Sequence, residues 1–162
     1  MIVVEERLRD LFLALPSVGY GSVDYNPIFS FGNEDYLFRF LETKKNKRTY
    51  PLIWLETPIT SSGYKRVDAP ITLILATNSS ASLSNSDRLE KTIKPLLAPL
   101  VDNCIEGLHK SGFTTLDESS VRTSNYYNYG VDNDGNTYGV WDAIKLTCNV
   151  TITDCKQREF NF

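Results

Sequence analysis

The sequence predicts an α+β domain, in which a mixed, largely antiparallel sheet of about four to five strands packs against an N-terminal helix and a long proline-kinked helix. Two observations lead to this prediction. Apolar residues follow a helical period near the N-terminus and again over residues 86–110, and four short runs elsewhere are rich in the branched and aromatic residues of β-strands. A length of 162 residues suits a single domain, residues 1–162.

The first predicted element is an amphipathic helix over residues 2–15. Its apolar side chains recur at steps of four, three and four residues, at Val4, Leu8, Leu11 and Leu15. Pro16 ends this pattern, and residues 17–35 carry the Gly, Pro, Asn and Asp that are typical of a long connection. Because the connection also contains several aromatic residues, we expect a packed loop.

Three strands are predicted next, over residues 36–42, 50–56 and 70–77. The charged segment 43–49 between the first two favours a hairpin loop. Pro51 has no N–H group to donate, so it must lie at a strand start, at an edge or at a bulge. The third strand is apolar almost throughout, which predicts a central strand that is buried on both faces.

The long helix is predicted over residues 86–110, where an apolar stripe with a 3.6-residue period continues for about seven turns. Ser84 or Ser86 is suited to cap its start. Pro95 and Pro99 each remove one internal hydrogen bond, so we expect a kink or a split just before Pro95.

The last predicted element is a strand over residues 140–153, in which apolar and polar residues alternate. Asp142 is the single charge on its apolar face, near its start, where we expect the carboxylate to reach water. The preceding segment, residues 114–139, is polar and rich in turn residues around a group of tyrosines. It predicts a turn-rich region before the strand.

The composition argues against several classes of function. Seventeen basic and twenty acidic residues leave a net charge of −3, which is too small and too dispersed to indicate binding to DNA, RNA or anionic lipid. No apolar run approaches the roughly twenty residues of a membrane helix, and the N-terminus lacks the pattern of a secretory signal. We therefore expect a cytosolic protein without a membrane partner, with its three cysteines reduced: Cys104, Cys148 and Cys155.

Asp132, Asp134 and Asn136 alternate as the first ligands of a calcium-binding loop do. That motif also needs a glycine at its sixth position and a glutamate at its twelfth, where this chain has Thr137 and Ala143. Asp-Gly and Gly-Asn pairs are instead preferred in tight hairpin turns. We interpret the loop as the tip of a hairpin and predict neither a metal site nor a cofactor.

The candidate catalytic groups do not form a recognisable set. His109, the only histidine, lies five residues after Cys104 on the predicted helix, so the two side chains point in different directions about its axis. The sequence contains no glycine pattern of a nucleophile elbow or of a phosphate-binding loop. We interpret His109 as a surface residue and predict that the chain is not an enzyme.

Two groups of side chains are candidates for binding. Aromatic residues around the predicted hairpin tip suit contact with another subunit, because Tyr and Trp bury a large area at a small cost in entropy; they are Tyr126, Tyr127, Tyr129, Tyr138 and Trp141. The one basic cluster favours an exposed loop, with contact to passing DNA as a further hypothesis; it consists of Lys44, Lys45, Lys47 and Arg48.

Helix, ribbon, buried strand, proline-bearing helix, tyrosine-rich loop and terminal strand follow one another along the chain, with the phrases "YPLIWLETP" (50–58), "PITLILAT" (70–77), "RLEKTIKPLLAPLVDNCIEGL" (88–108) and "GVWDAIKLTCNVTI" (139–152). This order resembles that of the small tail-terminator and head–tail neck proteins of tailed bacteriophages, over most of the chain. The resemblance implies a non-enzymatic subunit of the virion, assembled in the host cytoplasm. Such a subunit forms a ring, commonly a hexamer, and contacts other head, neck or tail proteins.

A second hypothesis from another class stays open. The chain would then be a small ligand-binding or hydrolytic α+β domain that uses an aromatic pocket between Tyr126 and Tyr138.

Overall fold

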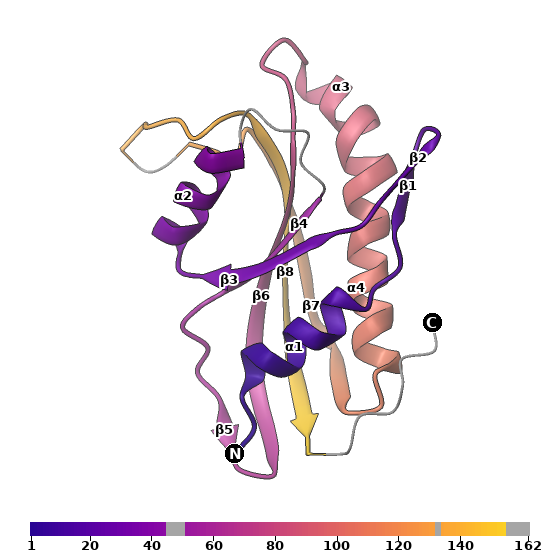
Figure 1. Ribbon diagram of the computed structural model, residues 1–162, viewed down its shortest axis with the longest axis vertical. Helices are drawn as coiled ribbons and strands as arrows, with labels where there is room; N and C mark the ends of the chain where they lie inside the picture. Colours follow the sequence, from indigo (N-terminus) through magenta and orange to yellow (C-terminus); the bar gives the residue numbers. More distant parts are fainter. Residues whose placement is uncertain (45–50, 132–133, 155–162) are drawn as a thin grey trace.

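The computed structural model describes residues 1–44, 51–131 and 134–154 of the chain. Three helical segments in direct succession form one long helix, which lies beside the main sheet (Figure 1). The elements are α1 (Val4–Leu13), β1 (Val18–Tyr20), β2 (Val23–Tyr25), β3 (Ile28–Gly32), α2 (Glu34–Lys44), β4 (Leu52–Glu56), β5 (Ser62–Gly63), β6 (Arg66–Asn78), α3 (Asn85–Arg88), η1 (Leu89–Leu97), α4 (Ala98–Lys110), β7 (Thr114–Tyr127) and β8 (Trp141–Thr153).

The main sheet has the strand order β3-β4-β6-β8-β7, and the short β5 pairs with β6 beside this path. Of its described pairs, β3 with β4 is parallel and the others are antiparallel. β1 and β2 form a separate two-stranded hairpin. The predicted α+β class is confirmed, and the main sheet has six strands where four to five were expected.

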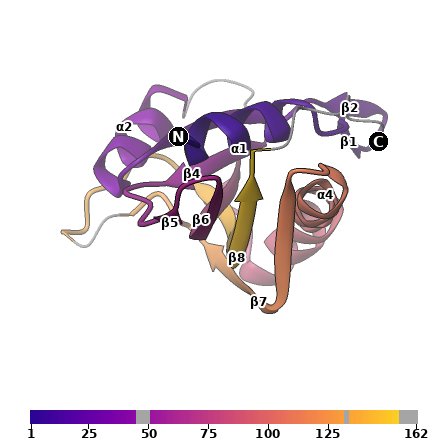
Figure 2. The same cartoon turned by 90° about the horizontal axis from the view of Figure 1, so that it is seen from below.

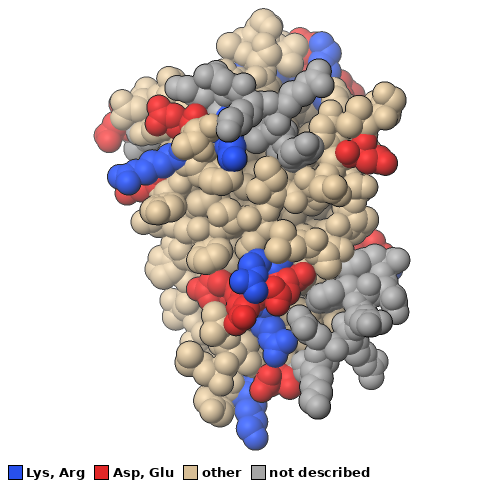
Figure 3. All heavy atoms as spheres, viewed as in Figure 1, with Lys and Arg blue, Asp and Glu red and all other residues tan. Residues whose placement is uncertain are grey.

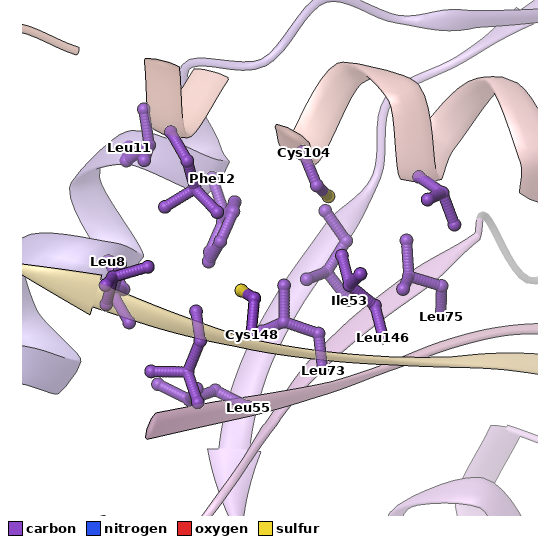
Figure 4. Packing of buried hydrophobic residues seen from close by; sticks show 14 of the residues in the cluster. Leu8, Leu11, Phe12, Ile53, Leu55, Leu73, Leu75, Cys104, Leu146 and Cys148 are labelled. Atoms are coloured by element: carbon purple, nitrogen blue, oxygen red, sulfur yellow. The ribbon is translucent and has the colours of Figure 1, made fainter. Parts of the chain in front are cut away.

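Helices cover the two faces of the sheet unequally. Figure 2 shows the long helix, labelled α4, along one side of the sheet, whereas α2 lies near β4 and leaves the sheet below it open. α1 and the long helix bury the main core against one face. Figure 4 shows part of this core, in which Cys104 of the long helix and Cys148 of β8 point into the same layer. α2 buries a second, smaller core against the opposite face.

The predicted N-terminal helix is confirmed as α1. Leu8 and Leu11 are fully buried and Phe12 nearly so, since they lie on the face that meets the sheet. The ring of Phe12 also contacts that of Phe29 in β3, with 5.7 Å between centroids. Each of these side chains contributes roughly 1.5–3 kcal/mol through burial.

The strand predicted over residues 36–42 is wrong, because this segment belongs to the helix α2. Asn33 caps the helix: its side-chain oxygen accepts a hydrogen bond from Tyr36 N over 3.0 Å. Leu37, Phe38 and Leu41 are buried at helical spacing on one side. The aromatic composition of the segment favoured a strand, whereas the Asn33 cap and the helical spacing of the buried residues favour a helix. Thr43 and Lys44 are the last residues of α2, so the hairpin loop predicted over residues 43–49 lacks its first strand; the rest of that segment lies outside the described residues.

The connection over residues 17–35 is packed only in part, because Val18 is buried whereas residues 19–24 are exposed, and it is more regular than a loop. It contains the hairpin of β1 and β2, with Gly21 in the turn at a φ of 63°, and then β3. Since β3 pairs in parallel with β4, from Ile28 beside Leu52 onward, its strand structure depends on a partner that follows much later in the chain.

The predicted long helix is confirmed, together with its interruption. Ser84 caps its start in a reciprocal capping box with Asp87, and the hydrogen bonds from Ser84 hold the pKa of Asp87 below its usual value. The segment η1 has π-helical winding and contains Pro95. At its end Ala98 N donates to the carbonyl of Ile93, five residues back, because the proline has removed a regular α-helical bond.

The strands predicted over residues 50–56, 70–77 and 140–153 are confirmed as β4, β6 and β8. Pro51 directly precedes β4, as its missing N–H requires. The turn-rich reading of residues 114–139 is wrong for its first half, which forms the long strand β7. β7 pairs along β8 with an irregularity between Asp117 and Arg122. Most of its side chains are exposed, so it lacks the apolar alternation by which strands are recognised.

Candidate subunit interface

Beyond β7 and β8 the two arms of the hairpin remain paired. Tyr129 N donates to Trp141 O and Tyr138 N to Gly130 O, each over 2.7 Å. In the turn, Gly135 has a φ of 81°, a backbone conformation that glycine adopts without strain. The interpretation of the Asp-rich loop as a hairpin tip is confirmed.

The predicted tyrosines divide into packed and exposed residues. Tyr138 stacks on Phe38 of α2 with 5.1 Å between ring centroids, and Tyr129 lies 6.0 Å from the same ring. Tyr126 is 40% exposed and meets Tyr129 edge-on at 5.6 Å, whereas Tyr127 packs against the main core. Aromatic contacts therefore hold the tip to α2 and leave Tyr126 as the ring best placed to touch another molecule.

Trp141 does not belong to an exposed surface, and its assignment to a subunit contact is wrong. It is fully buried at the base of the hairpin, in the core formed with α2. Its indole N–H donates to Tyr138 O over 3.1 Å, which satisfies its polar group inside the chain.

Tyr129 stands beside two acidic groups. Burial raises the pKa of its hydroxyl, and the carboxylates of Glu34 and Glu56 raise it further, so the hydroxyl keeps its proton at neutral pH. Lys145 Nζ lies 3.5 Å from Glu56 Oε2 across the same region. The cavity that these residues line measures about 30 Å³, room for about one water molecule.

Asp134 and Asn136 lie at the exposed hairpin tip, and Asp132 falls outside the described residues. Within the described part of the chain, no group of three or more His, Cys, Asp or Glu side chains is placed to hold a metal. We expect calcium at millimolar concentration to leave the melting temperature unchanged in the wild type and in Asp134→Ala. A saturable rise in the wild type that Asp134→Ala abolishes would contradict this prediction.

The basic cluster is described only at its first member. Lys44 is the last residue of α2, and its Nζ lies 5.5 Å from the ring centroid of Phe40; Lys45, Lys47 and Arg48 fall outside the described residues. On the face seen in Figure 3, described basic and acidic side chains are interspersed, above all over α1, where Arg9 pairs with Asp10 at 2.8 Å. Contact of the cluster with DNA stays a hypothesis.

The candidate catalytic side chains lie apart. Cys104 and Cys148 are buried free thiols, and burial raises the pKa of Cys104 far above its ordinary value and that of Cys148 to about 12. Both thiols are therefore protonated and poor nucleophiles at neutral pH. His109 is a surface residue, as predicted, with Nε2 3.3 Å from Glu118 Oε1. Asp117 instead accepts hydrogen bonds from Ser119, so the adjacent carboxylates have separate partners.

A buried ion pair ties the long helix to β8, and the sequence reading missed it. Arg88 Nη1 lies 3.5 Å from Asp142 Oδ1, and both side chains are almost fully buried. Thr92 Oγ1 lies 2.7 Å from Asp142 Oδ2 and 2.6 Å from Arg88 O. Its single hydroxyl hydrogen serves one acceptor at a time, and the carboxylate is the stronger. The expectation that Asp142 reaches water is wrong, because Arg88 covers it.

The open edge of the sheet is β7, which pairs with β8 on one side and with no described strand on the other. Residues 122–126 are all exposed, and the first residue of this run is its single charge. We call residues 122–127 the edge strip. Sequence reasoning missed it, because β7 becomes the edge only through the strand order, in which β8 lies between β6 and β7.

A second exposed surface lies at the other end of the sheet. Phe31 of β3 is 48% exposed and Tyr36 of α2 64%. Together with Pro58 they line a shallow hollow of about 590 Å³, which Glu5 also borders. We call Phe31, Tyr36 and Pro58 the corner patch. It was not foreseen, because only the pairing of β3 with β4 brings these residues together.

No protein-family description matches the chain, and no curated protein matches it in sequence. None of the described helices is long and apolar enough to cross a membrane.

Proposed function

We propose that this chain is a structural subunit of a tailed phage or prophage virion, a tail-terminator or neck protein that forms a ring at the head–tail junction. It assembles in the host cytoplasm with copies of itself and with other virion proteins, and it has no enzymatic role. The proposal rests on two supports. The first is the sequence resemblance to such proteins, of which the N-terminal helix, the buried strand, the proline-bearing helix and the terminal strand are present in the fold, whereas residues 36–42 form a helix and not the first strand of a ribbon. The second is the open edge strip of β7.

Natural proteins protect the edges of their sheets, because an unpaired strand offers its N–H and C=O groups to other chains. The edge strip has little such protection: apart from Arg122 at its start, it contains no charge, proline or glycine. A covering partner explains why so long an edge is left open. A subunit that is always assembled provides that partner.

The ligand-binding alternative gains little support from the tyrosines. Their rings pack on one another and on Phe38, and the cavity beside Tyr129 is about 30 Å³, far below the roughly 300 Å³ at which ligand pockets begin. That alternative predicts a rise in melting temperature with some metabolite in a broad panel.

The measurement that tests the ring is the mass of the purified protein by light scattering over a range of concentrations, alone and beside candidate neighbour proteins. We expect a step from the monomer to one closed species of several times its mass, since a ring closes at a fixed number of copies. A strict monomer under every condition would contradict the proposal.

A further inference from the structure

We propose that copies of this chain join head to tail, with the edge strip of one copy seated against the corner patch of the next. This inference rests on the proposed ring and names the two surfaces that build it. They lie at opposite ends of the strand order β3-β4-β6-β8-β7, and Figure 2 shows β7 remote from β4.

The edge strip supplies a strand and an aromatic ring. Its six residues extend about 20 Å at roughly 3.3 Å each. In the pairing of β7 with β8, Ser124 lies beside Lys145 and Tyr126 beside Ala143. Ala143 belongs to the second core, so Ser124 and Tyr126 project from the same face of the sheet as α2, which covers only part of that face. Tyr126 therefore lies at the edge of the sheet with an exposed ring, which can insert into a hollow on a neighbouring copy.

The corner patch supplies the hollow. Phe31, Tyr36 and Pro58 form the apolar part of its wall, and polar side chains form the rest: Glu5, Asn33 and Thr57. Phe31 and Tyr36 keep large exposed areas. Exposed aromatic rings beside a concave surface are typical of protein interfaces, where an inserted aromatic side chain contributes much of the affinity.

The charges of the two surfaces are complementary. Arg122 begins the edge strip, and its exposed guanidinium is also bonded to the carbonyls of Ser119 and Val121, which fixes its position. Glu5 borders the hollow, and Glu34 and Asp35 form the first turn of α2 next to it. The one cation of the edge strip and the acidic groups of the corner favour the pairing of unlike surfaces and disfavour corner against corner.

This complementarity indicates a second copy of the chain as the occupant. Two different surfaces at opposite ends of one subunit make a heterologous contact, which repeats from copy to copy and closes into a ring where the rotation allows it. A two-fold dimer through two edge strips would leave the corner patch uncovered.

The test uses two variants, each damaged on one side. The edge variant carries Ser124→Glu and Tyr126→Glu, and the corner variant carries Phe31→Glu and Tyr36→Glu. Tyr36→Glu alone and Ser124→Glu alone keep the test valid if a double variant loses stability. The matched control, Ser61→Glu with Tyr64→Glu, alters exposed residues in the β5 region.

We expect each damaged variant to be monomeric by mass photometry, with its dissociation constant raised at least about 100-fold. Glutamates on the edge strip repel the acidic corner of the next copy, and glutamates in the corner patch lose their contact with water when the interface forms. The control should form rings. A one-to-one mixture of the two variants should form a dimer and nothing larger, because it contains one intact edge strip and one intact corner patch.

Rings in either damaged variant would overturn the interface while leaving the ring function standing. A mixture that stays monomeric would overturn the interface as well. Loss of assembly in the edge variant alone would also overturn it, because that result indicates a two-fold contact between two edge strips. A wild-type chain that is monomeric in every condition would overturn the ring function itself, and the interface with it.

Discussion

Replacing Asp142 with alanine is expected to lower the free energy of unfolding by about 3–5 kcal/mol, because it leaves the guanidinium of Arg88 buried without its counter-charge. Arg88 Nη2 keeps its bond to Ser80 O at 3.1 Å, whereas Arg88 Nε already has no partner among the described residues. Since domains are stable by only about 5–15 kcal/mol, the variant should be close to unfolding. Urea denaturation at neutral pH measures the loss.

Two controls separate the buried pair from the charge change itself. Asp102→Ala removes an exposed carboxylate from α4 and should cost less than about 0.5 kcal/mol. Arg88→Met combined with Asp142→Leu removes both charges and should recover much of the loss, as apolar replacements of buried pairs often do. An Asp142→Ala variant as stable as Asp102→Ala would show that water reaches the pair.

Replacing Trp141 with alanine is expected to cost about 3–5 kcal/mol, since it empties the centre of the second core. The indole is fully buried, and the substitution also removes its bond to Tyr138 O at the base of the hairpin. For a domain of this size the melting temperature should fall by roughly 10 °C. Thermal unfolding followed by circular dichroism provides the measurement.

Trp141→Phe keeps most of the apolar volume and loses the hydrogen bond, so it should cost clearly less than alanine. Tyr64→Ala, which truncates an aromatic residue that is 68% exposed, serves as the matched control. A loss in Trp141→Ala no larger than in Tyr64→Ala would mean that Trp141 lies at a surface, as the sequence first indicated.

Sequence patterns predicted the elements whose burial is one-sided and regular. The spacing of Leu8 and Leu11 on α1 and the alternation along β8 follow directly from the periods of helix and strand. Pro95 likewise indicated the interruption of the long helix, because a missing N–H acts locally. The prediction for α2 was wrong because the aromatic composition was given more weight than the signals of a helix start, which are Asn33 and the two acidic residues after it.

The candidate interface was less predictable, because its parts are far apart in the chain. The tyrosines were correctly placed at a hairpin, but which of them face outward depends on Phe38 of α2, about ninety residues earlier. Phe31 and Tyr126 are exposed, but the residues around them in the sequence do not distinguish them from buried aromatic residues. Their exposure follows from the strand order, which places β3 and β7 at the two ends of the sheet.

By itself, the sequence determined the class of the fold, the main helices, three of the strands and the hairpin tip, since each depends on neighbours along the chain. The tertiary structure alone decided that residues 114–127 are a strand, because β8 supplies the hydrogen bonds that their own composition does not favour. It also decided that Asp142 is buried, because Arg88 lies over it from an element 54 residues away. Pairing and burial between distant segments are properties of the folded chain, which local periodicity does not encode.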